Sequence, residues 1–256
     1  MFSRSDYLLG LGVAVAAAFL TWLLSLHKRD VSIVDSLWPL LFILLAVVYA
    51  AAAPGRGPRA LLALGLVTAW GLRLSIFITW RNWGHEEDRR YQAIRGRNQP
   101  NFGLKSLYLV FVLQALLAWI ISLPLHAAIS RGGSLSIADV LGSALWLLGF
   151  VFEAVGDWQL AHFKRDPAHR GRVMDRGFWR FTRHPNYFGD FCVWWGLYVV
   201  ALGAGGWWSI VGPLLMSVLL LRVSGVTLLE KDIAERRPGY ADYRRRTNAF
   251  FPGKPK

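Results

Sequence analysis

Residues 183–190, which read Arg-His-Pro-Asn-Tyr-Phe-Gly-Asp, combine groups suited to binding an anionic ligand at the start of an apolar helix. Pro185 is favoured in a first helical turn, and Asn186 can cap that helix. A helix N-terminus attracts anions such as phosphate, and Arg183 and His184 add positive charge. Asp190 lies on the same helical face as Asn186 and would accept a hydrogen bond from a ribose hydroxyl or a carboxamide. A structural turn with an interfacial Asp is the alternative interpretation.

Three ionisable residues near the end of the preceding apolar segment also share one helical face. Glu153 and Asp157 are four residues apart, and Lys164 follows seven residues after Asp157. Carboxylates within a membrane span are costly, so they are functional candidates by default. A compatible alternative is that they pair with Arg73 or Arg222 and hold the helices together. Because a buried Arg needs an anionic partner, Arg222 is also a candidate for binding phosphate.

The N-terminal half offers fewer groups suited to chemistry. Asp35 lies at the start of one apolar segment, Arg73 lies within the next, and Tyr91 ends the charged stretch that follows. His85 precedes three acids but lacks a second ligand four residues away, so we expect no metal site. The alternating charges around it favour a solvated helix face. Gln114 is expected to form a hydrogen bond with a neighbouring helix.

The composition excludes an ordinary soluble domain. Hydrophobic residues make up 54% of the 256 residues and charged residues 18%, against averages of about 45–50% and about 25%. An intrinsically disordered chain and a secreted disulfide scaffold are excluded as well. Cys192 is the only cysteine, so neither an internal disulfide nor a multi-cysteine metal site can form.

Seven segments are apolar enough to form membrane-spanning helices, which need roughly 20 residues each. They are Tyr7–Leu26, Ile33–Ala53, Ala60–Trp80, Leu104–Ile129, Ala138–Phe163, Tyr187–Gly203 and Trp207–Leu229. Residues 54–58 break the chain after the second span, and residues 203–206 predict a tight hairpin between the sixth and seventh. Pro124 and Pro213 are expected to kink the spans that contain them. The sequence therefore predicts a single all-α membrane domain, 1–256, of about seven transmembrane helices.

Most of the 29 Lys and Arg residues lie in the loops after the first, third and fifth spans and in the C-terminal tail. By the positive-inside rule, this places the N-terminus outside and the tail in the cytoplasm. The basic loop after the fifth span also carries aromatic residues, which would suit nucleic acid or anionic lipid. In so apolar a chain we expect the bilayer as the partner and no nucleic acid. Long basic inner loops also suit a charged cosubstrate from the cytosol.

The motif at 183–190, followed by Arg222 and an acidic–Tyr–basic tail, resembles the steroid 5-alpha-reductase C-terminal domain superfamily. Within that superfamily the chain is most similar to the bacterial branch of membrane proteins called DUF1295. Three further stretches resemble that branch: Val34–Trp38, Trp80–Tyr91 and Arg222–Val226. The resemblance covers nearly the whole chain and is strongest from Glu153 to Pro252. A looser His-Pro-x-Tyr version occurs in isoprenylcysteine-type methyltransferases, so the motif alone leaves the cofactor open.

The resemblance implies a reductase that holds NADPH between its C-terminal spans and inner loops. Residues 1–135 would then form the substrate side, and residues 136–256 the cofactor-binding half. The residues that correspond by position to cofactor-facing residues of the reductases are Asp157, Lys164, Asn186, Asp190, Arg222 and Tyr240. Arg183, His184 and Tyr187 of the motif complete the expected cofactor-binding set. Glu153 stands where steroid reductases have an Asn.

Steroid reductases use a Tyr and a Glu of early spans on the steroid carbonyl, and this chain departs from that pattern. A polar group must still stabilise the developing enolate and supply a proton, and the candidates are Asp35, Arg73 and Tyr91. The expected activity is NADPH-dependent hydride transfer to a C=C bond of a lipophilic enone, steroid-like or polyprenoid-like. The alternatives are an S-adenosylmethionine-dependent membrane methyltransferase and a lipid-binding protein without catalysis. The resemblance implies a bacterial inner membrane and leaves the oligomeric state open.

Overall fold

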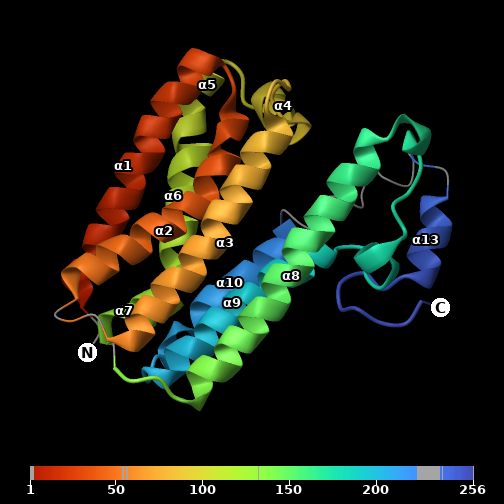
Figure 1. Cartoon of the computed structure of the whole chain (residues 1–256). Helices are drawn as coiled ribbons and strands as arrows, with labels where there is room; N and C mark the ends of the chain where they lie inside the picture. The colour runs from red at the N-terminus through yellow and green to blue at the C-terminus, as the bar shows by residue number, and fades with distance from the viewer. Residues whose placement is uncertain are drawn as a thin grey trace.

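The computed structural model describes residues 3–53, 55, 57–131, 133–223, 237 and 239–255. These residues form helices joined by turns, with no β-strand among them. The long helices are α1 (Arg4–Lys28), α2 (Val34–Ala52), α3 (Pro58–Asn82), α8 (Ile137–Arg165) and α9 (Pro185–Gly203). The shorter ones are α4 (Arg89–Arg97), α5 (Phe102–Ser106), α6 (Leu113–Ile121), α7 (Leu123–Arg131), α10 (Val211–Val218) and α13 (Tyr240–Arg246). Figure 1 shows α1, α2, α3 and α6 grouped on one side of the bundle, and α8, α9 and α10 on the other.

The prediction of an all-α membrane bundle is confirmed. Five helical stretches of the described chain are long and apolar enough to cross a membrane: Arg4–Lys28, Val31–Ala52, Pro58–Asn82, Phe102–Ile121 and Ile137–Arg165. The sixth predicted span corresponds to α9, which is not among these five. The seventh corresponds to a shorter apolar stretch, Trp207–Val223, and its last residues, 224–229, lie outside the described residues. The number of spans therefore stays a prediction.

Two predicted interruptions of the helices take different forms. The fourth predicted span is divided, because α6 ends at Ile121 and α7, which contains Pro124, begins at Leu123. A π-helical turn, η2 (Leu107–Val112), joins α5 to α6 in the same span. Pro213 lies in the first turn of α10, where a proline is tolerated without a kink. The predicted hairpin is present, because α9 ends at Gly203 and a 3₁₀ turn begins at Trp207.

A row of glycines holds α8 against α9. It consists of Gly142, Gly149 and Gly156 on α8 and Gly189, Gly196 and Gly203 on α9, each set spaced by seven residues. A Cβ atom on Gly149 would lie 2.4 Å from the Gly189 carbonyl oxygen, and one on Gly142 would lie 2.7 Å from the Gly196 carbonyl oxygen. No side chain fits there, so the two backbones touch, as small residues permit in membrane helix pairs. We call this row the glycine seam.

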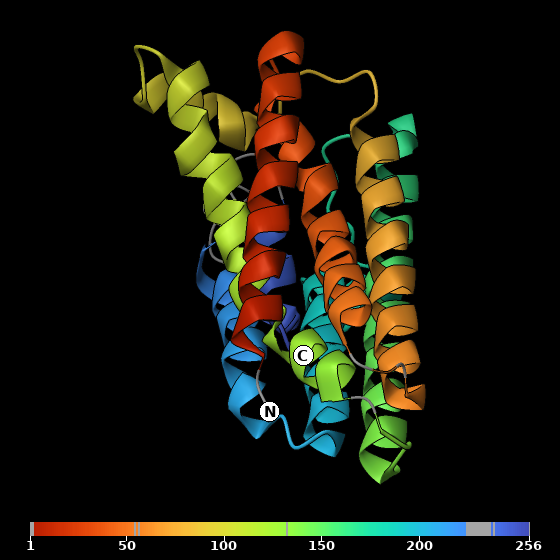
Figure 2. The same cartoon turned by 90° about the vertical axis from the view of Figure 1, so that its left-hand side faces the viewer.

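The ends of the helices place the basic loops together. At one end, the Arg165 guanidinium lies 4.1 Å from the ring centroid of Trp80, which joins the ends of α8 and α3. At the opposite end, Arg59 and Asp139 form a buried 2.8 Å ion pair between the starts of the same helices. Figure 2 shows α1, α2 and α3 side by side, with α8 behind α3. This arrangement is the one that the charge pattern requires, while the orientation in a membrane stays a prediction.

The C-terminal segment packs on the loop between α8 and α9. Tyr243 of α13 donates its hydroxyl to the Trp179 carbonyl oxygen. The backbone N–H of Arg183 donates to the Asn248 carbonyl oxygen at 2.9 Å. Figure 1 shows α13 beside this loop, beyond α8. The tail is therefore fixed to the segment that leads into α9.

Candidate functional site

Arg73 of α3 bridges two carboxylates of α8. Its Nη1 donates to Oε1 of Glu153 at 2.9 Å, and its Nη2 donates to Oδ2 of Asp157 at 2.8 Å. The Trp70 indole N–H donates to the second oxygen of Glu153 at 2.9 Å, and the Asn186 amide donates to the second oxygen of Asp157 at 3.1 Å. We call the group the acid cluster, which comprises Trp70, Arg73, Glu153, Asp157, Asn186 and Asp190. The expected pairing of Arg73 with these carboxylates is confirmed.

Asp190 of α9 gives the acid cluster an excess of acidic groups. Its side chain is buried, its neighbouring donor is the Trp194 indole one turn further along α9, and its Oδ1 completes no hydrogen bond of good geometry among the described residues. Glu153 and Asp157 are buried as well. Among the described residues, the cluster therefore holds three buried carboxylates, and Arg73 forms ion pairs with two of them, Glu153 and Asp157. Such a site favours a further hydrogen-bond donor, a proton or a cationic ligand, because unpaired buried charge is costly.

A second polar cluster joins α2 to α4. The Tyr91 hydroxyl donates to Oδ1 of Asp35 at 2.6 Å, and Arg90 Nη2 donates to Oδ2 at 2.7 Å. Gln114, two residues after the π-helical turn, donates to the Tyr91 oxygen at 3.3 Å. Burial raises the pKa of the Tyr91 hydroxyl and the Asp35 carboxylate raises it further, so this hydroxyl is a neutral donor. We call Asp35, Asp88, Arg90, Tyr91 and Gln114 the Asp35–Tyr91 cluster.

The charged stretch before α4 was expected to be a solvated helix face: His85 and Glu86 are exposed, but residues 85–88 are not helical, and Glu87 and Asp88 form specific contacts. Glu87 accepts the Val31 backbone N–H at 2.9 Å and forms a 2.7 Å ion pair with Arg95. Asp88 caps α4 by accepting the Arg90 backbone N–H at 2.9 Å. Burial raises the pKa of Glu87, but the hydrogen bonds from Arg95 and Val31 outweigh it and hold that pKa below its ordinary value. These contacts fix α4, and with it Tyr91, over the start of α2.

Tyr187 lies between the two clusters. Its phenol is within electrostatic range of Arg90 in the Asp35–Tyr91 cluster and of Asp157 and Asp190 in the acid cluster. The His184 ring stacks nearly parallel to it, with ring centroids 5.7 Å apart. The motif at the start of α9 therefore links both clusters.

Basic side chains gather beside the acid cluster. Arg81 and Arg237 both lie within electrostatic range of Lys164, whose acidic neighbour is Asp157. Lys164 and Arg81 are exposed at the end of the bundle where the basic loops lie. Converging like charges of this kind attract an anion such as a phosphate. Sequence reasoning did not single out Arg81 or Arg237, because neither is near Lys164 in the chain.

The structure places the predicted site residues in separate parts of the molecule. Of the three catalytic candidates, Asp35 and Tyr91 are hydrogen-bonded to each other, whereas Arg73 lies in the acid cluster. Arg183 is buried, and its guanidinium donates to the Thr247 and Arg244 carbonyl oxygens at 2.6 and 3.1 Å.

Two further predicted cofactor residues lie apart from the acid cluster's hydrogen bonds. Tyr240 is buried in the tail, where its ring packs edge-on against Tyr243. Arg222 is exposed on the π-helical turn η6 (Leu219–Val223) and joins none of the ion pairs found among the described residues. Within the same described ranges, no group of three His, Cys, Asp or Glu side chains is placed to hold a metal ion.

Sequence reasoning also missed Trp70 and the glycine seam. The N–H of Trp70 reaches Glu153 from another helix, so no local pattern marks it. The seam had a signal in the sequence, because three glycines at a spacing of seven occur in each of two apolar segments. That spacing keeps residues on one side of a helix.

A helical bundle with five apolar helices of spanning length and buried polar clusters between them defines an integral, multi-pass membrane protein. The chain belongs to the DUF1295 family, described as proteins of unknown function, whose model matches residues 21–247. It is similar to an uncharacterized protein, C594.04c, of Schizosaccharomyces pombe, at 24% identity over 288 residues, which cover 98% of this chain and 81% of that protein. No solved structure matches. The matched family region contains both polar clusters.

Proposed function

We propose that the protein is a membrane-embedded, NADPH-dependent reductase that transfers hydride to a C=C bond of a lipophilic enone. The observation that carries the proposal is the hydrogen bond from Tyr91 to Asp35. Asp35 accepts the single hydroxyl hydrogen of Tyr91 in this structure, and a bound substrate would take over that hydrogen bond at a carbonyl oxygen on which negative charge develops. The proposal places the basic loops, and the entry of the cofactor, on the cytoplasmic side.

The residues of the acid cluster fit a nicotinamide dinucleotide. The buried Oδ1 of Asp190 completes no hydrogen bond of good geometry among the described residues, and a carboxamide N–H would supply one. Lys164 and Arg81 offer positive charge for phosphate groups at the end of the bundle. When bound, NADPH supplies the hydride, and the protein supplies binding and orientation.

The protein's own part of the reaction centres on the Asp35–Tyr91 cluster. On substrate binding, the Tyr91 hydroxyl would turn its hydrogen from Asp35 to the substrate carbonyl oxygen and stabilise the enolate. Asp35 orients that hydroxyl, and Arg90 balances the Asp35 charge. Gln114 holds the Tyr91 oxygen from the opposite direction and so restricts its rotation.

A second candidate, an S-adenosylmethionine-dependent methyltransferase, is supported by a different observation. The acid cluster holds three buried carboxylates, of which Arg73 pairs with two, and this excess would stabilise a cationic sulfonium. The basic group around Lys164 favours the first candidate, because S-adenosylmethionine carries no phosphate. The two candidates therefore differ in which part of the site binds the ligand.

A thermal-shift titration of the detergent-purified protein with NADPH, NADH and S-adenosylmethionine tests the proposal. At 100 times its dissociation constant, a ligand that binds the folded protein stabilises it by about 2.7 kcal/mol. We expect a thermal shift of the wild type with NADPH, a smaller shift of the Lys164→Ala/Arg81→Ala double variant, and a wild-type shift of the control Arg97→Ala. A shift with S-adenosylmethionine alone would make the methyltransferase the better description. No shift with any ligand would favour a lipid-binding protein without catalysis.

A further inference from the structure

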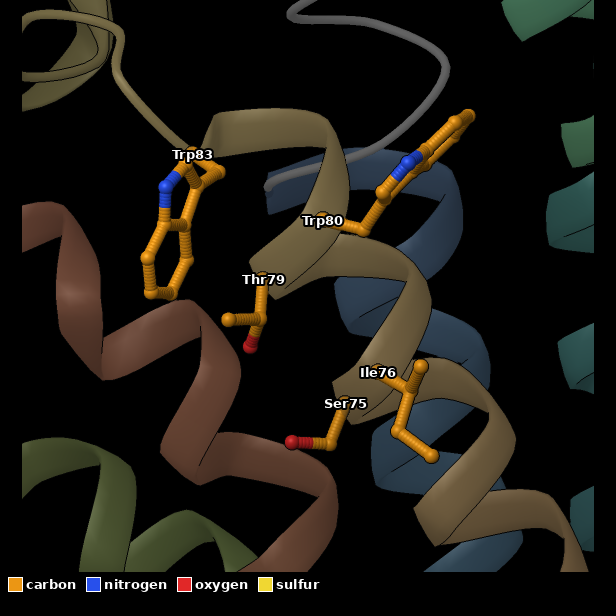
Figure 3. Close-up of a pocket in the computed structure, with 5 residues that line it drawn as sticks. All are labelled: Ser75, Ile76, Thr79, Trp80 and Trp83. Carbon is orange, nitrogen blue, oxygen red and sulfur yellow. The ribbon is translucent and has the colours of Figure 1, made fainter.

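Two pockets on the helix surfaces differ in the groups that they offer to a ligand. The first, of about 400 Å³, runs along the last turns of α3 and is lined by uncharged residues: Ser75, Ile76, Thr79, Trp80 and Trp83 (Figure 3). Its two hydroxyls already donate hydrogen bonds, both to Ser36 of α2. This pocket therefore has neither a charged side chain nor a spare hydroxyl hydrogen with which to select a ligand.

The second pocket, of about 240 Å³, is basic and aromatic. It lies between the last turns of α8 and the loop that follows, which contains the 3₁₀ turns η3 (Pro167–His169) and η4 (Gly177–Arg180). Figure 1 shows this loop turning back beside the end of α8. We call it the α8 pocket, and its lining includes Trp158, Gln159, His162, Phe163, His169 and Arg176.

Stacked rings form two walls of the α8 pocket. The His162 imidazole stacks on the Trp158 indole, with ring centroids 5.6 Å apart and planes 15° apart. The His169 imidazole stacks on the Phe163 ring, with centroids 4.2 Å apart and planes 11° apart. Stacking holds both imidazoles in fixed planes, so the directions in which their ring nitrogens can form hydrogen bonds are restricted.

Gln159 supplies an oriented amide. Its side-chain oxygen accepts the backbone N–H of Phe178 at 3.0 Å, which leaves the amide nitrogen as a donor. A Cβ atom on Gly177 would lie 2.4 Å from that nitrogen, so only a glycine, here with a φ of 56°, leaves room for the amide. The loop is therefore shaped around the Gln159 side chain.

The α8 pocket has an excess of donors over acceptors. Arg176 is exposed and joins none of the ion pairs found among the described residues. The two acids of the adjacent loop are already paired, Asp166 with His169 at 3.4 Å and Asp175 with Arg246. A guanidinium, an imidazole and an amide without a competing carboxylate form a donor set that suits an anion, and a phosphate above all.

This pocket is separate from the acid cluster and from the basic group beside it. His162 precedes Lys164 by two residues, which is about 200° of rotation in an α-helix, so the two side chains leave α8 on opposite sides. An anion in the α8 pocket would therefore not occupy the place proposed for the phosphates of NADPH.

An exposed apolar strip leads along α8 to the pocket. Leu147, Val151 and Trp158 are exposed, and their spacings of four and seven residues place them on one face of the helix. Because α8 is apolar and long enough to cross a membrane, this face meets acyl chains. Trp158 lies at the end of the strip next to the basic loop, where tryptophan is typical of the membrane–water interface.

We propose that the α8 pocket binds the head group of an anionic phospholipid. The phosphate is held by Arg176, His162 and the Gln159 amide, and the acyl chains lie along Leu147 and Val151. A zwitterionic head group would also bring an ammonium ion, for which the lining offers no unpaired carboxylate. This inference does not rest on the proposed function.

A lipid titration of the detergent-purified protein, followed by thermal unfolding, tests the proposal. The probe is dioleoylphosphatidylglycerol. Dioleoylphosphatidylcholine has the same acyl chains, and glycerol phosphate has an anionic head without chains. We expect phosphatidylglycerol to raise Tm to a plateau, and the other two to need at least about tenfold more for half of the effect.

The matched variants remove the same charge inside and outside the pocket. Arg176→Gln/His162→Gln should raise the half-saturating concentration of phosphatidylglycerol by about tenfold. Arg180→Gln, in the same loop but outside the pocket lining, should leave it unchanged. An unchanged response of the double variant would overturn the proposal. An equal response of the wild type to phosphatidylcholine, or to glycerol phosphate, would overturn it too, because the first shows no head-group recognition and the second no role for the chains.

A labelling experiment covers the case in which the double variant does not fold. Trp158→Cys keeps the three donors, and the wild type, whose Cys192 is buried, gives the background. We expect phosphatidylglycerol to slow the reaction of position 158 with N-ethylmaleimide by about tenfold and to leave the exposed control Arg180→Cys unaffected. Equal rates at position 158 with and without the lipid would overturn the proposal.

The lipid site and the reductase can fail separately. The thermal shift with NADPH should be the same in Arg176→Gln/His162→Gln as in the wild type, and Lys164→Ala/Arg81→Ala should keep the response to phosphatidylglycerol. If the first double variant loses both responses, the pocket holds phosphates of the cofactor and the lipid proposal is wrong. If NADPH gives no shift in any protein but phosphatidylglycerol does, the reductase proposal fails and the lipid site stands.

Discussion

Gly189 of α9 lies in backbone contact with Glu153 of α8, so closely that a Cβ atom on Gly189 would meet the Glu153 backbone nitrogen at 2.4 Å. This contact sets how closely α8 and α9 approach and where along α8 the first turns of α9 lie. It places Asn186 and Asp190, three residues before and one residue after Gly189, beside Asp157. The acid cluster therefore depends on a glycine that carries no chemistry of its own.

Gly189→Ala should destabilise the protein by about 1–3 kcal/mol, because the backbone of α8 must move to admit the methyl group. Thermal unfolding in detergent measures the loss. Gly65→Ala on α3 is the control, since a Cβ atom there meets nothing within 4 Å. It should be neutral or stabilising by up to about 1 kcal/mol. Equal effects of the two substitutions would contradict the seam.

Arg73→Met should cost about 3–5 kcal/mol, because it leaves the buried Glu153 and Asp157 carboxylates without their cation. Adding Glu153→Gln and Asp157→Asn to this variant should recover much of the loss, since the triple variant buries no charge at these positions. Thermal unfolding of the single and triple variants checks this. The exposed Arg97→Ala should stay within about 0.5 kcal/mol of the wild type. An Arg73→Met protein as stable as the control would contradict the ion pairs.

Tyr91→Phe should lower kcat for reduction of progesterone, a lipophilic enone, by about 10²–10³-fold, because the donor to the developing enolate is removed. The thermal shift with NADPH should stay unchanged, since Tyr91 lies outside the acid cluster. Tyr108→Phe, at a tyrosine that is 58% exposed, is the matched control and should keep wild-type activity. A loss confined to the NADPH shift would show that Tyr91 serves the cofactor and not the substrate.

Glu87→Gln should destabilise the protein at neutral pH and much less in acid. The folded-state pKa of Glu87 lies below its ordinary value. Its contribution is therefore fully present above the unfolded pKa of roughly 4.3 and is lost as the pH falls through the folded-state pKa. The difference in Tm between wild type and variant, followed from pH 7 down to about pH 3, should shrink toward zero. A difference that does not depend on pH would show that the carboxylate charge is not involved.

Much of the fold could be predicted from local pattern. The apolar segments at α1, α2, α3 and α8 are long enough to identify helices, because length and hydropathy are properties of one segment at a time. Interruptions were harder to predict. Pro124 marked the division at Ser122 in the sequence, because proline removes a backbone donor, but not the residue at which the helix would end. The π-helical turn before Gln114 had no such local signal.

The candidate site could be predicted only in part. The spacing of Glu153 and Asp157 placed both carboxylates on one helix face, and Arg73 was among the cations expected to pair with them. The choice of Arg73 over Arg222 was not decided by spacing, because it depends on which helix lies against α8. The partners of Arg183 could not be predicted for a related reason: its guanidinium donates to carbonyl oxygens of a tail more than sixty residues away.

The sequence by itself determined that this protein is a helical membrane bundle with its basic loops at one end. Apolar length, glycine breaks and charge placement act locally, so they can be read along the chain. Only the tertiary structure decided that Tyr91 donates to Asp35, 56 residues away, and that Glu153 and Asp157 both pair with Arg73. These contacts depend on the distance between neighbouring helices. That distance is set by the size of the residues in contact, as where Gly189, which has no side chain, lies against the backbone of Glu153.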